Sequence, residues 1–124
     1  MNNEELARAF SSHHFEEVID RLAADVVWNL VGEARLEGRA AVVDACRGTA
    51  AEVENVTTIW LRFISTGDGD VVAVDVIGRY ESADGVTGVS SCDIYEFADG
   101  LIRGITSYTV EIDPDHPAAP RQGA

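Results

Sequence analysis

The feature that most restricts the fold is a series of four β-rich segments separated by short turns. Val, Ile, Thr, Tyr and Phe are concentrated in residues 56–66, 71–81, 87–97 and 101–112, and these residue types favour strands. Each turn between them contains an Asp-Gly pair, which readily adopts the positive φ angles of a tight hairpin turn. The sequence therefore predicts an antiparallel meander of four long strands.

The first half of the chain has a different pattern. Apolar residues recur at helical spacing in residues 4–12 and 15–23, and again in residues 39–54, which predicts three helices. Residues 25–31 are β-branched and aromatic and predict a short strand. Helices that precede the strands, instead of alternating with them, indicate an α+β fold. We expect three N-terminal helices packed on a strongly curved, mostly antiparallel sheet.

The length of the chain, 124 residues, fits one domain. We assign residues 1–112 to it. Residues 113–124 contain all three prolines of the chain and are predicted to form a flexible C-terminal tail.

The charge of the chain excludes several classes of function. The sequence has 22 acidic residues against nine basic ones, and every basic residue is arginine. A net charge of -13 repels nucleic-acid backbones and anionic lipid surfaces, so we expect neither as a partner. The absence of lysine excludes Schiff-base chemistry. The N-terminus has no basic flank or long apolar run, which favours a cytoplasmic location.

The sequence also predicts that no metal or cofactor is bound. The two cysteines, Cys46 and Cys92, are far apart and are interpreted as free thiols. His13 and His14 are interpreted as residues of a loop between two predicted helices, and no pair of histidines has metal-ligand spacing. No glycine-rich phosphate loop joins a strand to a helix.

Curvature of the sheet predicts a pocket. Strands of this length twist and coil strongly, and short helices cover only part of the concave face, which leaves an apolar hollow suited to a small hydrophobic molecule. If Glu96 points to solvent, Asp93, Tyr95 and Phe97 share the opposite face. A carboxyl group on such a face would have its pKa raised by desolvation.

Four segments of the sequence resemble a known superfamily. Residues 22–32, 36–42, 93–97 and 99–102 are similar to regions of the nuclear transport factor 2-like superfamily, which includes ketosteroid isomerases, SnoaL-like polyketide cyclases and limonene epoxide hydrolases. The similarity extends over roughly residues 5–112. It implies a cystatin-like α+β barrel, or roll, and a homodimer. It indicates the chemistry only weakly, because one fold hosts many functions.

The sequence has the residue type of ketosteroid isomerases at one of their three catalytic positions. Asp93 stands where their oxyanion-binding aspartic acid lies. Asn29 stands where the catalytic base is found, and an amide cannot abstract a proton. Leu6 or a near neighbour replaces their phenolic donor.

The sequence also lacks most of the catalytic residues of limonene epoxide hydrolases. Asp75 corresponds to one of their two catalytic aspartates, whereas Ala73 and Ser107 replace the arginine and the second aspartate. SnoaL-like cyclases need only one acid/base group in an apolar pocket, so the resemblance favours a cofactor-independent, cyclase- or isomerase-like enzyme acting on an apolar carbonyl compound.

The predicted catalytic residue is Asp93, with Asn29 as a hydrogen-bond partner that orients the substrate. The predicted substrate-binding residues are Asn29, Trp28, Tyr95, Phe97, Ser107 and Thr109.

Three alternatives remain open. Asp93 can be a structural carboxylate bonded to Ser or Thr on adjacent strands. The pocket can sequester a hydrophobic ligand without catalysis. The domain can also be a dimerisation module that uses the outer face of the sheet, with Trp60, Tyr80 and Tyr108 as its apolar surface.

Overall fold

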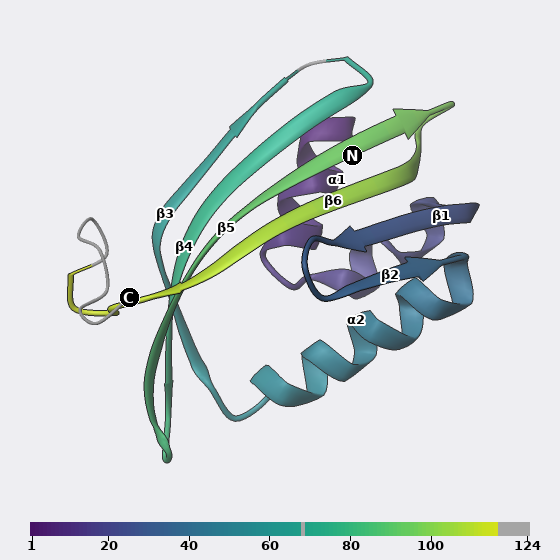
Figure 1. Cartoon of the computed structure of the whole chain (residues 1–124). Coiled ribbons are helices and arrows are strands. Elements are labelled where there is room, and N and C mark those ends of the chain that lie inside the picture. The colour runs from purple at the N-terminus through teal and green to yellow at the C-terminus, as the bar shows by residue number, and fades with distance from the viewer. Residues whose placement is uncertain (68, 117–124) are drawn as a thin grey trace.

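A bent six-stranded sheet with both α-helices on the same side forms the molecule (Figure 1). The computed structural model describes residues 1–67 and 69–116. Its elements, in chain order, are α1 (Asn3–Ser11), β1 (Leu22–Leu30), β2 (Ala34–Glu37), α2 (Arg39–Val53), β3 (Thr57–Thr66), β4 (Val71–Ser82), β5 (Gly85–Ala98) and β6 (Leu101–Ile112).

The four C-terminal strands pair as the sequence predicts. The strand order is β2-β1-β6-β5-β4-β3, and all neighbours are antiparallel except β1 and β6, which are parallel. The α+β class and the mostly antiparallel, curved sheet are confirmed.

The predicted helix over residues 15–23 is wrong. Two short 3₁₀ turns, Phe15–Glu17 and Ile19–Arg21, take its place, and β1 begins at Leu22. The buried pair Phe15 and Val18 is three residues apart, a spacing that a 3₁₀ turn satisfies as well as an α-helix does. The few residues left before β1 are too short a run for a cooperative helix. Residues 1–67 and 69–116 therefore contain two α-helices where three were expected.

Strand β2 was not predicted from the sequence. It pairs with the end of β1, from Val27 opposite Glu37 to Leu30 opposite Ala34. Its residues are mostly exposed, and two of its four side chains, Arg35 and Glu37, form an ion pair on the surface. An exposed edge strand of this kind lacks the apolar alternation that identifies a half-buried strand.

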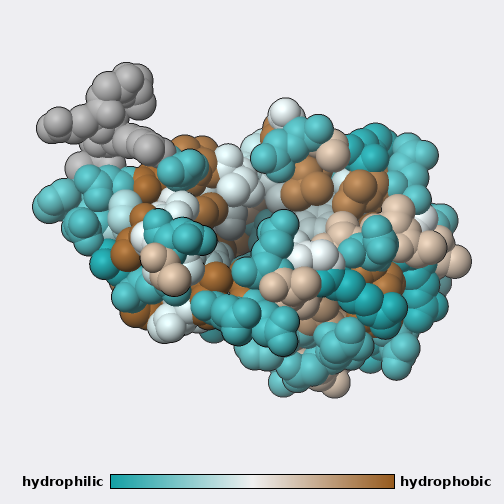
Figure 2. Space-filling model, turned by 90° about the horizontal axis from the view of Figure 1, so that it is seen from below, coloured by the Kyte–Doolittle hydropathy of each residue, from teal (hydrophilic) through white to brown (hydrophobic). Residues whose placement is uncertain are grey.

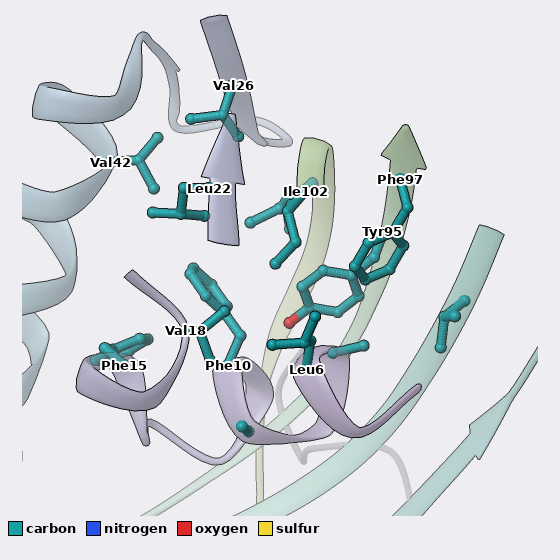
Figure 3. Close-up of a cluster of buried hydrophobic side chains, with 14 of the residues drawn as sticks. Leu6, Phe10, Phe15, Val18, Leu22, Val26, Val42, Tyr95, Phe97 and Ile102 are labelled. Atoms are coloured by element: carbon teal, nitrogen blue, oxygen red, sulfur yellow. The ribbon is translucent and has the colours of Figure 1, made fainter. Parts of the chain in front are cut away.

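The core lies between α1, the 3₁₀ turns and the inner face of the sheet. Leu6 and Phe10 of α1 face Tyr95 and Ile102 of the strands (Figure 3). An N-terminal capping box between Asn2 and Glu5 fixes the start of α1. This packing holds the C-terminal end of α1 against β5, where the candidate site lies. In the described parts of the chain, no helix is long and apolar enough to cross a membrane.

The beginning of the predicted tail contacts the sheet. The guanidinium of Arg79 donates to the Pro114 carbonyl at 3.1 Å and to Asp115 Oδ1 at 2.7 Å. Residues 117–124 of that tail lie outside the described residues.

Candidate functional site

A cavity of about 400 Å³ lies between the inner face of the sheet, the end of α1 and the C-terminal half of α2. Phe10, Phe15, Trp28, Val76 and Val89 contribute apolar surface to its walls. Figure 2 views the molecule from below and shows a hollowed surface in which apolar residues border hydrophilic ones. The curved sheet thus leaves space that its own side chains do not fill.

Asp93 lines this cavity from the middle of β5. Its two carboxyl oxygens accept separate hydrogen bonds: Ser11 Oγ donates to Oδ2 at 2.8 Å and Ser107 Oγ donates to Oδ1 at 2.6 Å. Burial raises the pKa of Asp93, and the two serine bonds lower it by less, so the net shift is upward. The carboxyl therefore holds its proton to a higher pH than an exposed aspartate does.

A second pair of donors orients the two serines. Trp28 Nε1 donates to Ser107 Oγ at 2.9 Å, and the hydroxyls of Tyr95 and Ser11 are 2.6 Å apart. Because the Ser11 proton is used toward an ionised Asp93, the Tyr95 hydroxyl donates to Ser11 in that state. Tyr95 is fully buried, and burial holds its pKa well above the ordinary value, so it remains a donor. Both chains of hydrogen bonds end at Asp93.

Four of the predicted site residues line the cavity: Asp93, Trp28, Ser107 and Thr109. Tyr95 lies behind it and reaches Asp93 through Ser11. Phe97 is buried in the core beside Tyr95, with ring centroids 6.5 Å apart.

The structure does not bring Asn29 together with Asp93. Successive side chains of a strand point to opposite faces. Trp28 faces the cavity, so Asn29 faces away, beside Arg35 and Thr106 in a separate hollow of about 620 Å³. That hollow is larger, but its lining includes the exposed ion pair between Arg103 and Asp25 and has no buried carboxyl. The carboxyl group that was predicted as the catalytic residue, Asp93, lies in the cavity of about 400 Å³ and not in this larger hollow.

Tyr80 is a cavity residue that the sequence reasoning assigned to the outer face. In β4 the inward side chains are Val72, Val74 and Val76, and Tyr80 continues the same alternation. Burial and the charge of Asp93 raise its pKa. Trp60 also faces inward, with its ring centroid 6.2 Å from that of Tyr80, so neither residue belongs to the outer surface. The even spacing along β4 was the signal for this assignment.

His13 is the second cavity residue that was missed. Its ring packs beside Phe15, Trp60 and Tyr80. Burial and the neighbouring His14 lower the pKa of His13. A histidine directly after a predicted helix was the available signal, but its side-chain direction depends on how the helix ends. The described residues contain no cluster of His, Cys, Asp and Glu able to hold a metal ion.

Comparison with known proteins identifies the domain. Residues 3–105 match the model of the SnoaL-like domain family. A solved structure of an NTF2-like protein of unknown function from Cytophaga hutchinsonii is similar, with 30% identity, a TM-score of 0.74 and coverage of 86% of this chain and 94% of that one. A search of curated protein sequences found no match.

Two more distant structures share the fold. One is a Xanthomonas campestris protein whose description as a polyketide cyclase is itself an inference (19% identity, TM-score 0.65, coverage 83% of each chain). The other is an LEH-like epoxide hydrolase from M. tuberculosis (21% identity, TM-score 0.60, coverage 82% of this chain and 74% of that one). The match over residues 3–105 covers most of the sequence, and the chain therefore belongs to the SnoaL-like domain family, within the NTF2-like superfamily.

Proposed function

We propose that the protein binds a small apolar carbonyl compound and catalyses a cofactor-independent acid/base reaction on it, of the cyclase or isomerase type. The observation that carries this proposal is the carboxyl group of Asp93, whose pKa is raised by burial, on the wall of a cavity of about 400 Å³. Perturbed carboxyl groups in clefts are typical of catalytic sites.

In this proposal Asp93 acts on the carbonyl oxygen of the substrate. A protonated carboxyl donates a hydrogen bond to that oxygen as negative charge develops on it, and the apolar walls strengthen the interaction by excluding water. Ser11 and Ser107 hold the carboxyl in place. Because a serine hydroxyl can donate or accept, both serines can stay bonded in either protonation state.

The structure gives little support to epoxide hydrolysis. Asp75, the one residue matched to that catalytic set, is paired with Arg62 at 2.8 Å on the outer face of the sheet. Ser107, which replaces the second catalytic aspartate, lines the cavity but has no carboxylate to activate water. Proton transfer at a carbonyl compound needs fewer groups and fits the residues present.

Replacing the carboxyl by an amide tests the proposal. Asp93→Asn, assayed against polyketide-like and conjugated ketones, is expected to lower turnover by about 10²–10⁴-fold, the usual contribution of a positioned acid or base. Asp75→Asn, the same change on the outer face of the neighbouring strand, is the matched control and should retain activity. Unchanged turnover in Asp93→Asn would reject the assignment. Thermal stabilisation of the wild-type protein by such ketones without product would instead identify a binding protein.

We also propose that the chain pairs with a second copy through the face of the sheet that is turned away from the helices. One row across this face joins Ile64, Asp75, Cys92 and Tyr108, which are partners in adjacent strands. Ile64, Tyr108 and the nearby Val110 are 49%, 50% and 61% exposed. Apolar side chains grouped in this way are typical of an interaction surface.

A further inference from the structure

His13 occupies a backbone position that normally belongs to glycine. Its φ is 69°, and two backbone bonds close the end of α1 around it: His14 N donates to the Ala9 carbonyl at 2.9 Å and His13 N to the Phe10 carbonyl at 3.0 Å. This pair of bonds is a Schellman motif, in which the left-handed residue is usually glycine because a Cβ is strained there. The chain keeps an imidazole where glycine would be the relaxed choice.

The imidazole of His13 is held by aromatic rings rather than by hydrogen bonds. Its centroid is 5.6 Å from those of Phe15 and Trp60 and 6.2 Å from that of Tyr80, which is stacked on it. Within residues 1–67 and 69–116, neither ring nitrogen has a hydrogen-bond or ion-pair partner. No polar side-chain atom there is buried without a partner, so the ring nitrogens are not sealed off from open space. His13 lines the cavity that contains Asp93 and also a second hollow of about 270 Å³.

His13 and Asp93 line the same cavity. The ring of Tyr80 is stacked on that of His13. The pKa of Tyr80 is raised by burial and, to a smaller extent, by the charge of Asp93. The other titratable groups facing the cavity are Glu33 and Glu52. The hollow of about 270 Å³ that His13 also lines is bordered by His14, Glu16, Glu17, Cys46 and Arg47. With its pKa lowered by burial and by His14, His13 is neutral at pH 7 and is able to accept a proton.

We propose that His13 is the catalytic base of this site and takes a proton from the carbon next to the substrate carbonyl. The electron pair of the broken C–H bond forms the C=C bond of an enolate, and the negative oxygen accepts a hydrogen bond from Asp93. The imidazolium then returns its proton to a carbon of the substrate, so no co-reactant is consumed. This inference rests on the proposed function and adds the group that Asn29, which lies on the other face, does not supply.

Deuterium exchange into β-tetralone, followed by ¹H NMR in D₂O, tests this role in the full-length chain. His13→Gly removes the imidazole at a position whose backbone suits glycine, and exchange should fall about 10²-fold or more. Added free imidazole should restore a large part of the rate, because it can occupy the space left by the side chain. His116→Asn, which removes an exposed imidazole that does not line the cavity, is the control and should retain exchange.

The pH profile separates a base from a structural residue. Wild-type exchange should rise with pH through the lowered pKa of His13, and exchange rescued in His13→Gly should follow the pKa of free imidazole. A folded His13→Gly variant with wild-type exchange, or one that imidazole does not rescue, would overturn the assignment. His13→Asn, which also tolerates a left-handed backbone, repeats the test if the glycine variant does not fold.

The two proposals fail in different ways. Slow exchange in Asp93→Asn with normal exchange in His13→Gly contradicts the role of His13 and keeps the proposed function. Slow exchange in His13→Gly with normal exchange in Asp93→Asn supports His13 and contradicts the role of Asp93. Wild-type protein that exchanges no faster than buffer contradicts both.

Discussion

Burial and the hydroxyls of Ser11 and Ser107 act in opposite directions on the protonation of Asp93. The hydroxyls stabilise the carboxylate, while burial destabilises it by more. The net upward shift of the pKa is a property of this one side chain, and it links the chemistry of the site to the stability of the protein.

The stability contributed by Asp93 should fall as the pH rises. Its folded pKa lies above the ordinary value of 3.8, so the native state binds more protons than the unfolded state between those two pKa values. The free energy of unfolding therefore decreases over that range. Urea unfolding of the wild type and of Asp93→Asn should show that the wild type loses stability relative to the variant between pH 4 and pH 8. A difference that stays constant, or that grows in favour of the wild type, would contradict the shift.

Ser107→Ala should destabilise the protein by about 1–3 kcal/mol, because it removes a donor to Asp93 and leaves Trp28 Nε1 without its acceptor. The pKa of Asp93 should also rise further. Urea unfolding measures the first effect and a carboxyl NMR titration the second. Ser90→Ala on the same sheet is the control, since Ser90 has no side-chain hydrogen bond in the described structure, and it should change neither quantity appreciably.

At the scale of the elements, alternation along strands was the most informative pattern. It predicted that Asp93, Tyr95 and Phe97 share a face, and Glu96 is indeed exposed. The same rule applied to β1 would have separated Trp28 from Asn29, and applied to β4 would have placed Tyr80 with the valines. Local patterns could not distinguish the 3₁₀ turns from a helix, because their apolar spacing is shared and tertiary packing decides between them.

The ring of Tyr80 lies close to the backbone of Gly78, two residues earlier in β4, and this predicts the effect of Gly78→Ala. A Cβ at Gly78 would lie 2.9 Å from the Tyr80 ring, so the ring must move away from its place beside His13. We expect a loss of about 1–3 kcal/mol in the free energy of unfolding and weaker binding of β-tetralone, measured by urea unfolding and by calorimetry. Gly48→Ala in α2, where nothing lies within 4 Å of the new Cβ, should instead stabilise the protein by about 0.5–1 kcal/mol. Unchanged binding in Gly78→Ala would show that Tyr80 does not shape the cavity.

At the scale of the whole molecule, the two faces of the sheet differ in what they present. The inner face encloses the cavity, and the outer face carries the exposed row that includes Ile64 and Tyr108. The sequence predicted the α+β class and the curved, mostly antiparallel sheet, because long strands must curve. It could not predict His13 as a cavity residue, since that depends on how α1 ends and on strands far along the chain.

The outer face should support a dimer. Sedimentation at micromolar concentration is expected to show a homodimer for the wild type. Tyr108→Glu places a charge on the exposed row and should shift the protein toward the monomer, whereas the charge-adding control Ala50→Glu on α2 should not. A wild-type monomer under these conditions would remove the support for pairing through this face.

The proposed function depends above all on a carboxyl group that is kept out of water at the wall of a cavity. A ¹³C NMR titration of the Asp93 carboxyl tests this directly. The pKa should lie clearly above the ordinary value of 3.8, and it should move when β-tetralone is bound. A pKa at or below 3.8, unaffected by the ketone, would contradict the proposed role of Asp93.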